Sequence, residues 1–457
     1  MSAIAARFAF ADRGTTLRTE VLGGVATFLT MSYIVFVNPA FLSAAGLPFE
    51  AVAVCTALGA AFFTALMGLV TNMPFALASG LGLNAVVAFD LILGRKLAPG
   101  AAMACILIEG LIAVALVLGG LREAVVRAVP ASLKLSIGVG IGLFITLVGL
   151  REGGITVNSD ATGIGLGDLS TGPPLVALGG ILAAIVVSAS GRRGAILVGV
   201  FTALALGLIF GVLDGPDGVT RMPHGSDFDI VGDAVSGDAL GDALTVSLIP
   251  VIFTLFMTDF FDTVGTAYAV GTAGGLVDAK GELGRAGDMK RVLLVDSAAA
   301  AGGGLLGVSS ITTYVESGAG VSEGARTGFA SLVTAGLFVL CIFFVPVIAL
   351  VGQEVSVGDA SLHPAVAPAL VMVGYLMLRL VQSIDWNDPS AAIPCFLIIV
   401  GVPMTFSISA GIGFGVIGYV AVMVAQRRAR EVSALMWVLV PLFIAFFEST
   451  WLEKHVF

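Results

Sequence analysis

Among the acidic side chains within long apolar stretches of this chain, where a carboxylate is least expected, five are candidates for chemistry. They are Glu109, Asp259, Asp262, Asp296 and Glu316. If those stretches cross a lipid bilayer, each charged group costs at least about 2.5–3.5 kcal/mol to insert, so each needs a reason to be there. Such acids can bind a polar solute, carry a proton or hydrogen-bond a neighbouring helix.

Two of these acids lie three residues apart in the segment 258–266, Thr-Asp-Phe-Phe-Asp-Thr-Val-Gly-Thr. A helix advances about 100° per residue, which places Asp259, Asp262 and Thr263 on one face together with Thr266. We expect this polar face to point into the protein. The alternative is that both acids only hydrogen-bond neighbouring helices, although two like charges so close together repel each other.

Glu316 and Asn84 stand in two segments that make poor continuous helices. Residues 74–84 are rich in Gly, and residues 308–320 are rich in Ser, Thr and Gly. Glu316 follows the β-prone stretch 311–315 and is expected at the start of a half-helix, where free backbone N–H groups favour a carboxylate. Irregular backbone at membrane depth borders buried protein or a watery cavity, so the two segments indicate a central binding site. A capping role for Glu316 and a structural role for Asn84 are the alternatives.

The remaining two acids, Glu109 and Asp296, fit helix packing and proton handling equally well. The four cysteines each stand alone in apolar runs, and the three histidines are scattered. Neither a metal site nor a catalytic Cys/His pair can be assembled from this spacing, and no HExxH motif is present. We therefore expect no metal, no cofactor and no enzymatic activity.

The composition excludes an ordinary soluble enzyme. Of 457 residues, 58% are apolar and only 12% are charged, and the mean hydropathy is +1.05. Soluble domains have roughly 25% charged and roughly 45–50% apolar residues, so this chain is predicted to be a polytopic protein of the lipid bilayer. The net charge of −9, with an acidic stretch from Asp214 to Asp242 that we interpret as a solvated loop, argues against nucleic-acid binding.

The apolar runs define the predicted membrane spans, because a bilayer core about 30 Å thick requires roughly 20 residues per helix. Fifteen apolar segments fit this length, and we predict fourteen spans because those between 391 and 425 are joined only by Ser409 and its small neighbours. The segments are 21–37, 51–71, 74–93, 101–119, 133–150, 174–190, 194–213, 246–273, 290–306, 308–325, 329–351, 364–381, 391–407, 410–425 and 434–450.

Positive charge predicts the orientation of these spans. Short cytoplasmic loops are enriched in Lys and Arg, and a cytoplasmic N-terminus puts sixteen of these residues inside and four outside. Seven spans before the acidic loop make the second half begin from the opposite side, which is the condition for an inverted-topology repeat. We therefore expect an all-α polytopic protein of the cell membrane, with two inverted seven-span repeats and short β-strands and half-helices in spans 3 and 10.

Several ordered motifs resemble those of a known family. They include the opening stretch 19–39, Asp-Phe-Phe-Asp-Thr-Val-Gly-Thr at 259–266 and Thr-Thr-Tyr-Val-Glu-Ser at 312–317. Shorter motifs lie at 82–85, 108–110, 130–134 and 140–144. Together they resemble the AzgA-like adenine/guanine/hypoxanthine permeases of the nucleobase-cation symporter-2 (nucleobase–ascorbate transporter) superfamily. The resemblance runs from about residue 13 to about residue 450.

The resemblance implies a core domain, formed by spans 1–4 and 8–11, and a gate domain formed by the others. The expected boundaries are 1–20 for the cytoplasmic N-terminus, 21–120 and 246–352 for the core, 121–214 and 363–450 for the gate, 215–245 for the acidic loop and 451–457 for the tail. A homodimer through the gate domain is a further expectation, by analogy with related transporters.

The resemblance also implies roles for individual residues. In the family, the acids that match Asp259 and Glu316 hold the base, and those that match Asp262 and Asp296 serve transport competence or proton coupling. The predicted substrate site is Asp259, Glu316, Asn84, Phe75, Phe261, Thr313, Tyr314 and Ser317, and the predicted proton-coupling set is Asp262, Asp296 and Glu109. The family commonly has Pro where this chain has Ser79, so the backbone of the site is expected to differ slightly there.

The chemistry of these residues suits a purine base, which is flat and neutral and carries N–H donors and ring-nitrogen acceptors. Carboxylates accept the N–H groups, Asn84 and backbone N–H groups serve the acceptors, and Phe75, Phe261 or Tyr314 could stack on the ring. Uphill import of a neutral solute needs a coupling ion. We therefore expect secondary active import of adenine, guanine or hypoxanthine with H⁺ by an elevator-like movement of core against gate.

Three rival functions are kept as alternatives. A transporter of uracil, xanthine or an anion could share this architecture, although an anion favours a cationic or purely backbone site and acids cluster here. An intramembrane enzyme lacks an apparent catalytic set. A channel is disfavoured because no repeated, ring-forming filter sequence is present.

Overall fold

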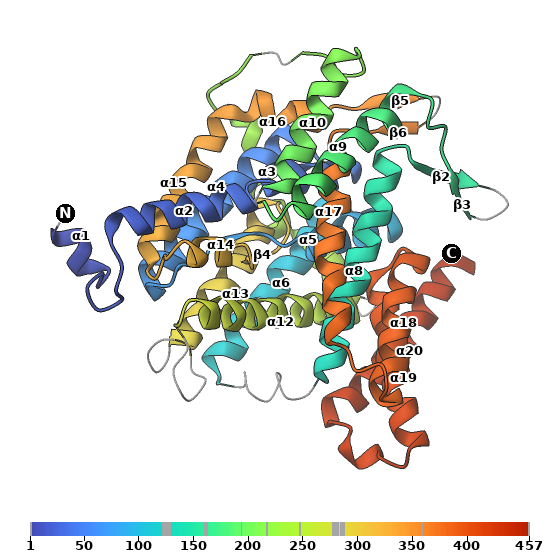
Figure 1. Ribbon diagram of the computed structural model, residues 1–457. Coiled ribbons are helices and arrows are strands. Elements are labelled where there is room, and N and C mark those ends of the chain that lie inside the picture. Colours follow the sequence, from blue (N-terminus) through green and yellow to red (C-terminus); the bar gives the residue numbers. More distant parts are fainter. Residues whose placement is uncertain are drawn as a thin grey trace.

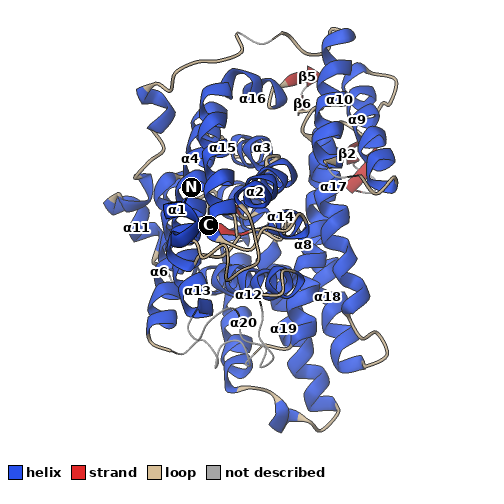
Figure 2. Cartoon of the chain, turned by 60° about the vertical axis from the view of Figure 1, so that its left-hand side comes forward, coloured by secondary structure: helices blue, strands red, loops and turns tan. Residues whose placement is uncertain are grey.

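The protein is almost entirely helical in the computed structural model, which describes residues 2–120, 129–159, 163–192, 194–215, 218–245, 248–276, 283, 288–357 and 360–455 (Figures 1 and 2). In the first half the helices are α1 (Ser2–Arg7), α2 (Leu17–Met31), α3 (Ile34–Ala44), α4 (Phe49–Thr71), α5 (Leu81–Ala85), the π-helix η1 (Val86–Gly94), α6 (Pro99–Leu118), α8 (Ala131–Glu152), α9 (Gly172–Ala189) and α10 (Ala195–Ile209).

The second half has the helices α11 (Gly237–Ala243), α12 (Ile249–Ala273), α13 (Asp288–Leu306), α14 (Ser317–Ser322), α15 (Gly328–Cys341), α16 (Val345–Val351), α17 (Ala367–Leu378), α18 (Pro389–Thr405), α19 (Ile408–Ala425) and α20 (Ala434–His455). Short 3₁₀ helices are η2 (Gly225–Phe228), η3 (Asp233–Val235), η5 (Ile342–Phe344), η6 (Arg379–Ser383) and η7 (Ala429–Glu431). Two peripheral hairpins pair β2 (Thr156–Ser159) with β3 (Gly163–Leu166), and β5 (Val355–Val357) with β6 (Ala360–Leu362).

A third strand pair lies inside the helical body. Strand β1 (Leu77–Ser79) runs antiparallel to β4 (Ile311–Thr313), and all six residues are buried. The pairing continues on both sides, because Gly80 N donates to Ser310 O at 2.8 Å and Tyr314 N donates to Ala76 O at 2.9 Å. Both strands lie in the two segments that make poor continuous helices, and their backbone groups satisfy one another where water is absent.

Side chains from neighbouring helices hold this strand pair in place. The Thr64 hydroxyl on α4 donates to Leu77 O at 3.0 Å and accepts from Leu77 N at 2.8 Å. The Asn38 amide on α3 donates to Thr56 Oγ1, Ser79 Oγ and Val308 O at 2.8–3.1 Å. Asn38 therefore ties the first strand segment to the second one by a single buried side chain.

The apolar helices are long enough for a membrane protein. Within the described residues, eight helices are long and apolar enough to cross a membrane, and five further apolar helices have 10–17 residues. The two segments between 391 and 425, which the sequence left as one or two spans, are two helices, α18 and α19, separated by Phe406 in a left-handed conformation. The count of fourteen spans remains a prediction.

The helices pack as two groups. The first helix group contains α2, α3, α4, α6, α12, α13, α14 and α15, and the second helix group contains α8, α9, α10, α17, α18, α19 and α20. In Figure 1, α8 and α17 stand upright while α12 and α13 run across the lower part of the molecule. The strand pair β1–β4 belongs with the first group, because it packs on α4, α12 and α13.

A buried ion pair joins the two groups. Asp90 on η1 contacts Arg95 at 3.3 Å, and its second oxygen accepts from Ser407 Oγ at 2.8 Å at the start of α19. The Arg95 guanidinium lies 4.6 Å from the ring centre of Phe446 on α20. The ion pair is shielded from water, and Asp90 also bonds to Ser407 in the second helix group. The otherwise apolar boundary between the two groups therefore contains a polar contact.

The acidic connection between the two halves is more ordered than the sequence suggests. Within it, Arg221 donates to both carboxylate oxygens of Asp227 at 2.8 Å and to Glu50 on α4 at 2.7 Å. The guanidinium hydrogen bonds hold the pKa of Asp227 below its ordinary value. Most of residues 218–245 are exposed, as expected of a solvated connection, but part of them is folded as η2, η3 and α11 and anchored to α4.

Asp227→Asn should loosen this connection at neutral pH. A carboxylate with a lowered pKa stabilises the fold above its ordinary pKa and stops doing so only as the pH falls through the lowered value. Limited proteolysis of residues 218–245 in the wild type should therefore proceed equally at about pH 7 and about pH 5, and several-fold faster in the variant at both. The exposed Asp229→Asn is the control, and equal cleavage of all three proteins would contradict the anchoring role.

Candidate substrate-binding site

The two acids of the 258–266 segment lie on α12 but in different surroundings. Asp259 is buried, with 2% of its surface exposed, and its Oδ1 accepts from Ser310 Oγ at 3.2 Å. Asp262, one turn further along the helix, is exposed. One helix face thus carries one acid enclosed by protein and one acid that a solute can reach.

Asp262 shares its surroundings with Glu316. The two carboxylates interact electrostatically, and Tyr33 and Tyr314 belong to the same group of side chains. Glu316 is half-buried and the preceding Val315 is 59% exposed, so this group borders open space. The resemblance implies Asp259 as the partner of Glu316 in holding a base; Asp262 lies on the same helix, α12, which packs against α14.

Glu316 stands at the start of α14, as the sequence predicts, but it does not cap that helix. Its side chain makes no capping hydrogen bond; instead Oε1 accepts from Tyr33 Oη at 2.6 Å. Tyr33 lies between α2 and α3, where the first apolar run is interrupted. A phenol from another part of the chain therefore bonds the carboxylate, while the first N–H groups of α14 donate to the carbonyl oxygens of Tyr314 and Val315.

Asp296 on α13 is bonded on both oxygens. Its Oδ1 accepts from Thr313 N at 2.8 Å and from Thr313 Oγ1 at 2.7 Å, and its Oδ2 accepts from Thr263 Oγ1 at 2.6 Å. These bonds join α13 to β4 and to α12. Asp296 was predicted for proton coupling and Thr313 as a substrate ligand, but here they bond to each other. Together they hold in place β4, the strand that precedes Glu316.

Unlike Asp296, Glu109 on α6 lies where its carboxylate is poorly supplied with hydrogen bonds. It is fully buried, and within the described part of the chain neither carboxylate oxygen has a hydrogen bond of ordinary geometry, since the neighbouring Ser310 hydroxyl donates to Asp259. It interacts electrostatically with Asp259 and Asp296. The next residue is Gly110, where a Cβ would lie 2.3 Å from Ala301 N, so α6 and α13 approach closely enough to exclude water.

Asn84 on α5 is fully buried, and neither its amide nitrogen nor its amide oxygen has a partner among the described residues. An unpartnered buried amide costs about 1–3 kcal/mol, so its donors and its acceptor are available to a ligand. Asn84 lies about one helical turn beyond Gly80, which follows β1, while Glu316 follows β4. Because the strands are antiparallel, the two candidate ligands lie beyond opposite ends of the strand pair.

The other predicted ligands have different positions. Phe75 is fully buried, Tyr314 is 6% exposed and its hydroxyl donates to Ser79 O at 2.5 Å, and Ser317 Oγ accepts from Ala76 N at 2.9 Å. The side chain of Phe261 lies outside the described residues. Tyr314 and Ser317 thus hold β1 against β4, and the structure brings neither ring of Phe75 nor of Tyr314 to the surface beside Glu316.

The departure at Ser79 has a structural consequence. The Ser79 hydroxyl accepts from Asn38 Nδ2 at 3.1 Å, a contact that Pro could not make because it has no side-chain acceptor. The backbone carbonyl of Ser79 still accepts from Tyr314. The expected difference in the backbone of the site is therefore accompanied by an extra hydrogen bond to α3.

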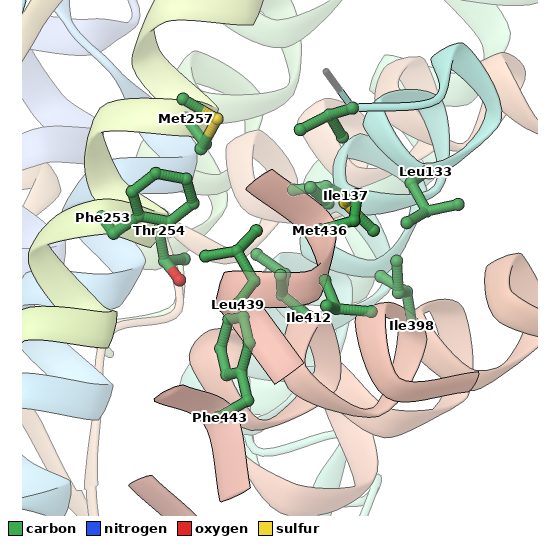
Figure 3. Close-up of a pocket in the computed structure, with 12 residues that line it drawn as sticks. Leu133, Ile137, Phe253, Thr254, Met257, Ile398, Ile412, Met436, Leu439 and Phe443 are labelled. Carbon is green, nitrogen blue, oxygen red and sulfur yellow. The ribbon is translucent and has the colours of Figure 1, made fainter. Parts of the chain in front are cut away.

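An apolar cavity lies elsewhere, between α12 and the second helix group (Figure 3). Its volume is about 20 Å³, little more than one water needs. Phe253, Thr254 and Met257 line one side, with Leu133 and Phe443 among the apolar residues opposite. A cavity so small, with Thr254 as its polar lining residue, does not fit a nucleobase.

Comparison with known proteins gives the family. A model of the Permease family matches residues 18–414. The chain belongs to this permease family. The guanine/hypoxanthine permease PbuG of Bacillus subtilis (strain 168) is 38% identical over 457 residues, covering 96% of this chain and 98% of that protein. The adenine permease AdeP of Escherichia coli (strain K12) is 35% identical over 437 residues, covering 96% and 94%.

The resemblance to purine permeases of the nucleobase–ascorbate transporter superfamily is thereby confirmed, and the permease is a multi-pass membrane transport protein. Its fold is similar to the transmembrane domain of the cyanobacterial bicarbonate transporter BicA, with a TM-score of 0.58, 18% identity and coverage of 86% of this chain and 97% of that one. SLC26A9 gives a TM-score of 0.61 at 15% identity, covering 91% and 66%. These two likenesses concern the fold alone.

The permease also has a serine within a GxSxG pattern, at residues 320–324. That pattern marks a nucleophile only on a sharp strand-to-helix turn. Here Ser322 is the last residue of α14, and its hydroxyl donates back to Gly318 O at 2.7 Å. The local fold therefore gives Ser322 no catalytic setting.

Sequence reasoning missed Tyr33 and Thr30. Tyr33 contacts the Glu316 carboxylate, and Thr30 Oγ1 lies 3.4 Å from the Glu316 carbonyl oxygen. Both residues lie in the opening stretch 19–39, but the apolar composition of that stretch predicts one continuous span. A Thr and a Tyr three residues apart, and thus on one helix face, were the available signal.

Asp296→Asn should destabilise the permease. The amide places an NH₂ group where hydrogen bonds from Thr263 or Thr313 now end, and losing a hydrogen bond to a charged group costs about 1.5–3 kcal/mol. The melting temperature of the purified protein in detergent should fall relative to the wild type and to the exposed-site control Asp12→Asn. An unchanged melting temperature would contradict the anchoring role of Asp296.

Proposed function

We propose that this permease imports purine nucleobases of the adenine, guanine and hypoxanthine class by H⁺ symport. The observation that carries the proposal is the buried amide of Asn84, which has no partner among the described residues, beyond one end of the strand pair, with the half-buried Glu316 beyond the other end. The names of PbuG and AdeP support the substrate class. Transport of uracil, xanthine or an anion is the alternative.

In this proposal Asp262 and Glu316 accept N–H groups from the edge of the base. Asn84 supplies a donor and an acceptor, and its lack of any protein partner within the described chain supports this role. Phe261 remains a candidate for stacking. Asp262 takes the place that the resemblance gives to Asp259, because Asp262 is exposed, on a helix that packs against the one that Glu316 begins, while Asp259 is enclosed.

Asp259 and Glu109 then carry the proton. A buried carboxylate that accepts few hydrogen bonds is costly, and binding a proton removes that cost. Glu109 has no hydrogen bond of ordinary geometry within the described chain, and the negative charge of Asp259 lies nearby. The two acids can share one proton, as closely coupled carboxyl groups do. Asp296 keeps an anchoring role in this scheme, since its oxygens are already bonded.

The first helix group acts as the core domain and the second as the gate domain, and substrate crosses by an elevator-like movement of core against gate. The strand pair and the acids belong to the first group, which supports their movement as one body. We place the protein in the cell membrane with its N-terminus in the cytoplasm, and a homodimer would form through the gate.

Asp262→Asn and Glu316→Gln should each weaken hypoxanthine binding by about 1.5–3 kcal/mol, because each removes an ionised acceptor. This corresponds to a roughly 10- to 150-fold higher Kd, measured by calorimetry on the purified protein. Asp259→Asn should leave the Kd within about twofold. A strong loss in Asp259→Asn, with Asp262→Asn unchanged, would instead restore the roles that the resemblance implies.

Proteoliposomes with an imposed pH gradient, acidic outside and free of Na⁺, should accumulate hypoxanthine. Glu109→Gln keeps the size of the side chain but cannot bind and release a proton, so it should retain exchange of labelled for unlabelled base and lose accumulation. A protonophore should abolish accumulation by the wild type. Accumulation that appears only with Na⁺ would refute proton coupling and leave the nucleobase assignment intact.

A further inference from the structure

Glu316 is held by a residue outside the known motifs of the site. Tyr33 is 2% exposed, and its hydroxyl donates to Glu316 Oε1 at 2.6 Å. The distance is typical of a hydrogen bond from a hydroxyl to an ionised carboxylate, which is among the stronger kinds. Tyr33 also interacts electrostatically with Asp262 and Tyr314, so it faces the same group of side chains.

The local backbone explains why a tyrosine at this position can reach Glu316. Helix α2 ends at Met31 and α3 begins at Ile34, and Ser32 and Tyr33 form the turn between them. One turn earlier, Thr30 Oγ1 lies 3.4 Å from the Glu316 carbonyl oxygen. The end of α2 and the turn after it therefore contact Glu316 at two points. Thr30 contacts its carbonyl oxygen, and Tyr33 contacts its carboxylate.

The contact with Tyr33 occupies one oxygen of the Glu316 carboxylate, Oε1. No side chain of another described residue donates to Oε2 of Glu316, and Glu316 is only half-buried. A carboxylate on an unrestrained Glu side chain samples several rotamers, and ordering it on binding lowers affinity. A phenol that already binds one oxygen fixes the direction of the other.

We propose that Tyr33 is a positioning residue for substrate recognition, which orients Glu316 so that Oε2 accepts an N–H group of the nucleobase. The inference rests on the proposed function, since it requires Glu316 to be a ligand. Tyr33 itself need not touch the substrate. Its contribution to affinity must then pass entirely through the Glu316 carboxylate.

A double-mutant cycle on the full-length purified protein tests this dependence. Tyr33→Phe should raise the Kd for hypoxanthine roughly 10-fold or more, the scale of one hydrogen bond to a charged group. In the Glu316→Gln background, Tyr33→Phe should change the Kd by less than about twofold, because the oriented carboxylate is already gone. In transport assays the KM should rise while the maximal rate stays near that of the wild type.

Tyr375→Phe is the matched control, because Tyr375 is 48% exposed on α17 and loses the same hydroxyl. It should leave both Kd and KM unchanged. If Glu316→Gln itself leaves the Kd unchanged, the proposed function fails. If Glu316→Gln weakens binding but Tyr33→Phe has no effect, or has the same effect in both backgrounds, the proposed function stands and the positioning role of Tyr33 is refuted.

Discussion

The pairing of β1 with β4 is the interaction on which the rest of the site depends. Two segments that cannot continue as helices would leave backbone N–H and C=O groups without water inside the bilayer, which costs several kcal/mol per group. Each segment supplies the partners that the other lacks, over Leu77–Ser79 and Ile311–Thr313. Because the two strands are antiparallel, the segments that follow them leave at opposite ends of the pair, with Asn84 beyond the end formed by Ser79 and Ile311 and Glu316 beyond the other end.

The four acids around this strand pair show that burial alone does not determine what a carboxylate does. Asp296 and Glu109 are both buried, yet Asp296 accepts three hydrogen bonds and Glu109 none of ordinary geometry among the described residues. Asp259 and Asp262 are three residues apart on one helix, yet only Asp262 is exposed. Donors and solvent access, rather than position in the sequence, separate an anchor from a ligand or a proton carrier.

Much of the site's framework could be predicted from the sequence, because it depends on local properties. The β-prone stretch 311–315 and the Gly-rich stretch 74–84 correctly indicate the two interruptions, and the start of α14 at Ser317 follows from the same pattern. Periodicity also places Asp259 and Asp262 on one helix. It cannot tell which end of that face reaches open space, since this depends on the helices packed around it.

The contacts that the sequence could not reveal join residues far apart in the chain. Tyr33 and Glu316 are 283 residues apart, and nothing in the composition of the stretch 19–39 indicates that the hydroxyl has a distant partner. The hydrogen bond from Asn38 to Ser79 was hidden for a related reason, because the sequence showed only that Ser replaces a common Pro. The anchored part of the acidic connection likewise depends on Arg221 meeting Glu50 in the folded protein.

The long separation of the two strands also affects how the protein is made. β1 leaves the ribosome about 230 residues before β4, and at the ordinary pace of synthesis this interval is on the order of tens of seconds. Throughout that time the polar backbone of β1 needs a temporary partner, such as water or the membrane-insertion machinery. A chain truncated before Ile311 lacks β4, which is the permanent partner of β1. The first half of this permease, when it is produced alone, is therefore expected to be degraded by quality-control proteases.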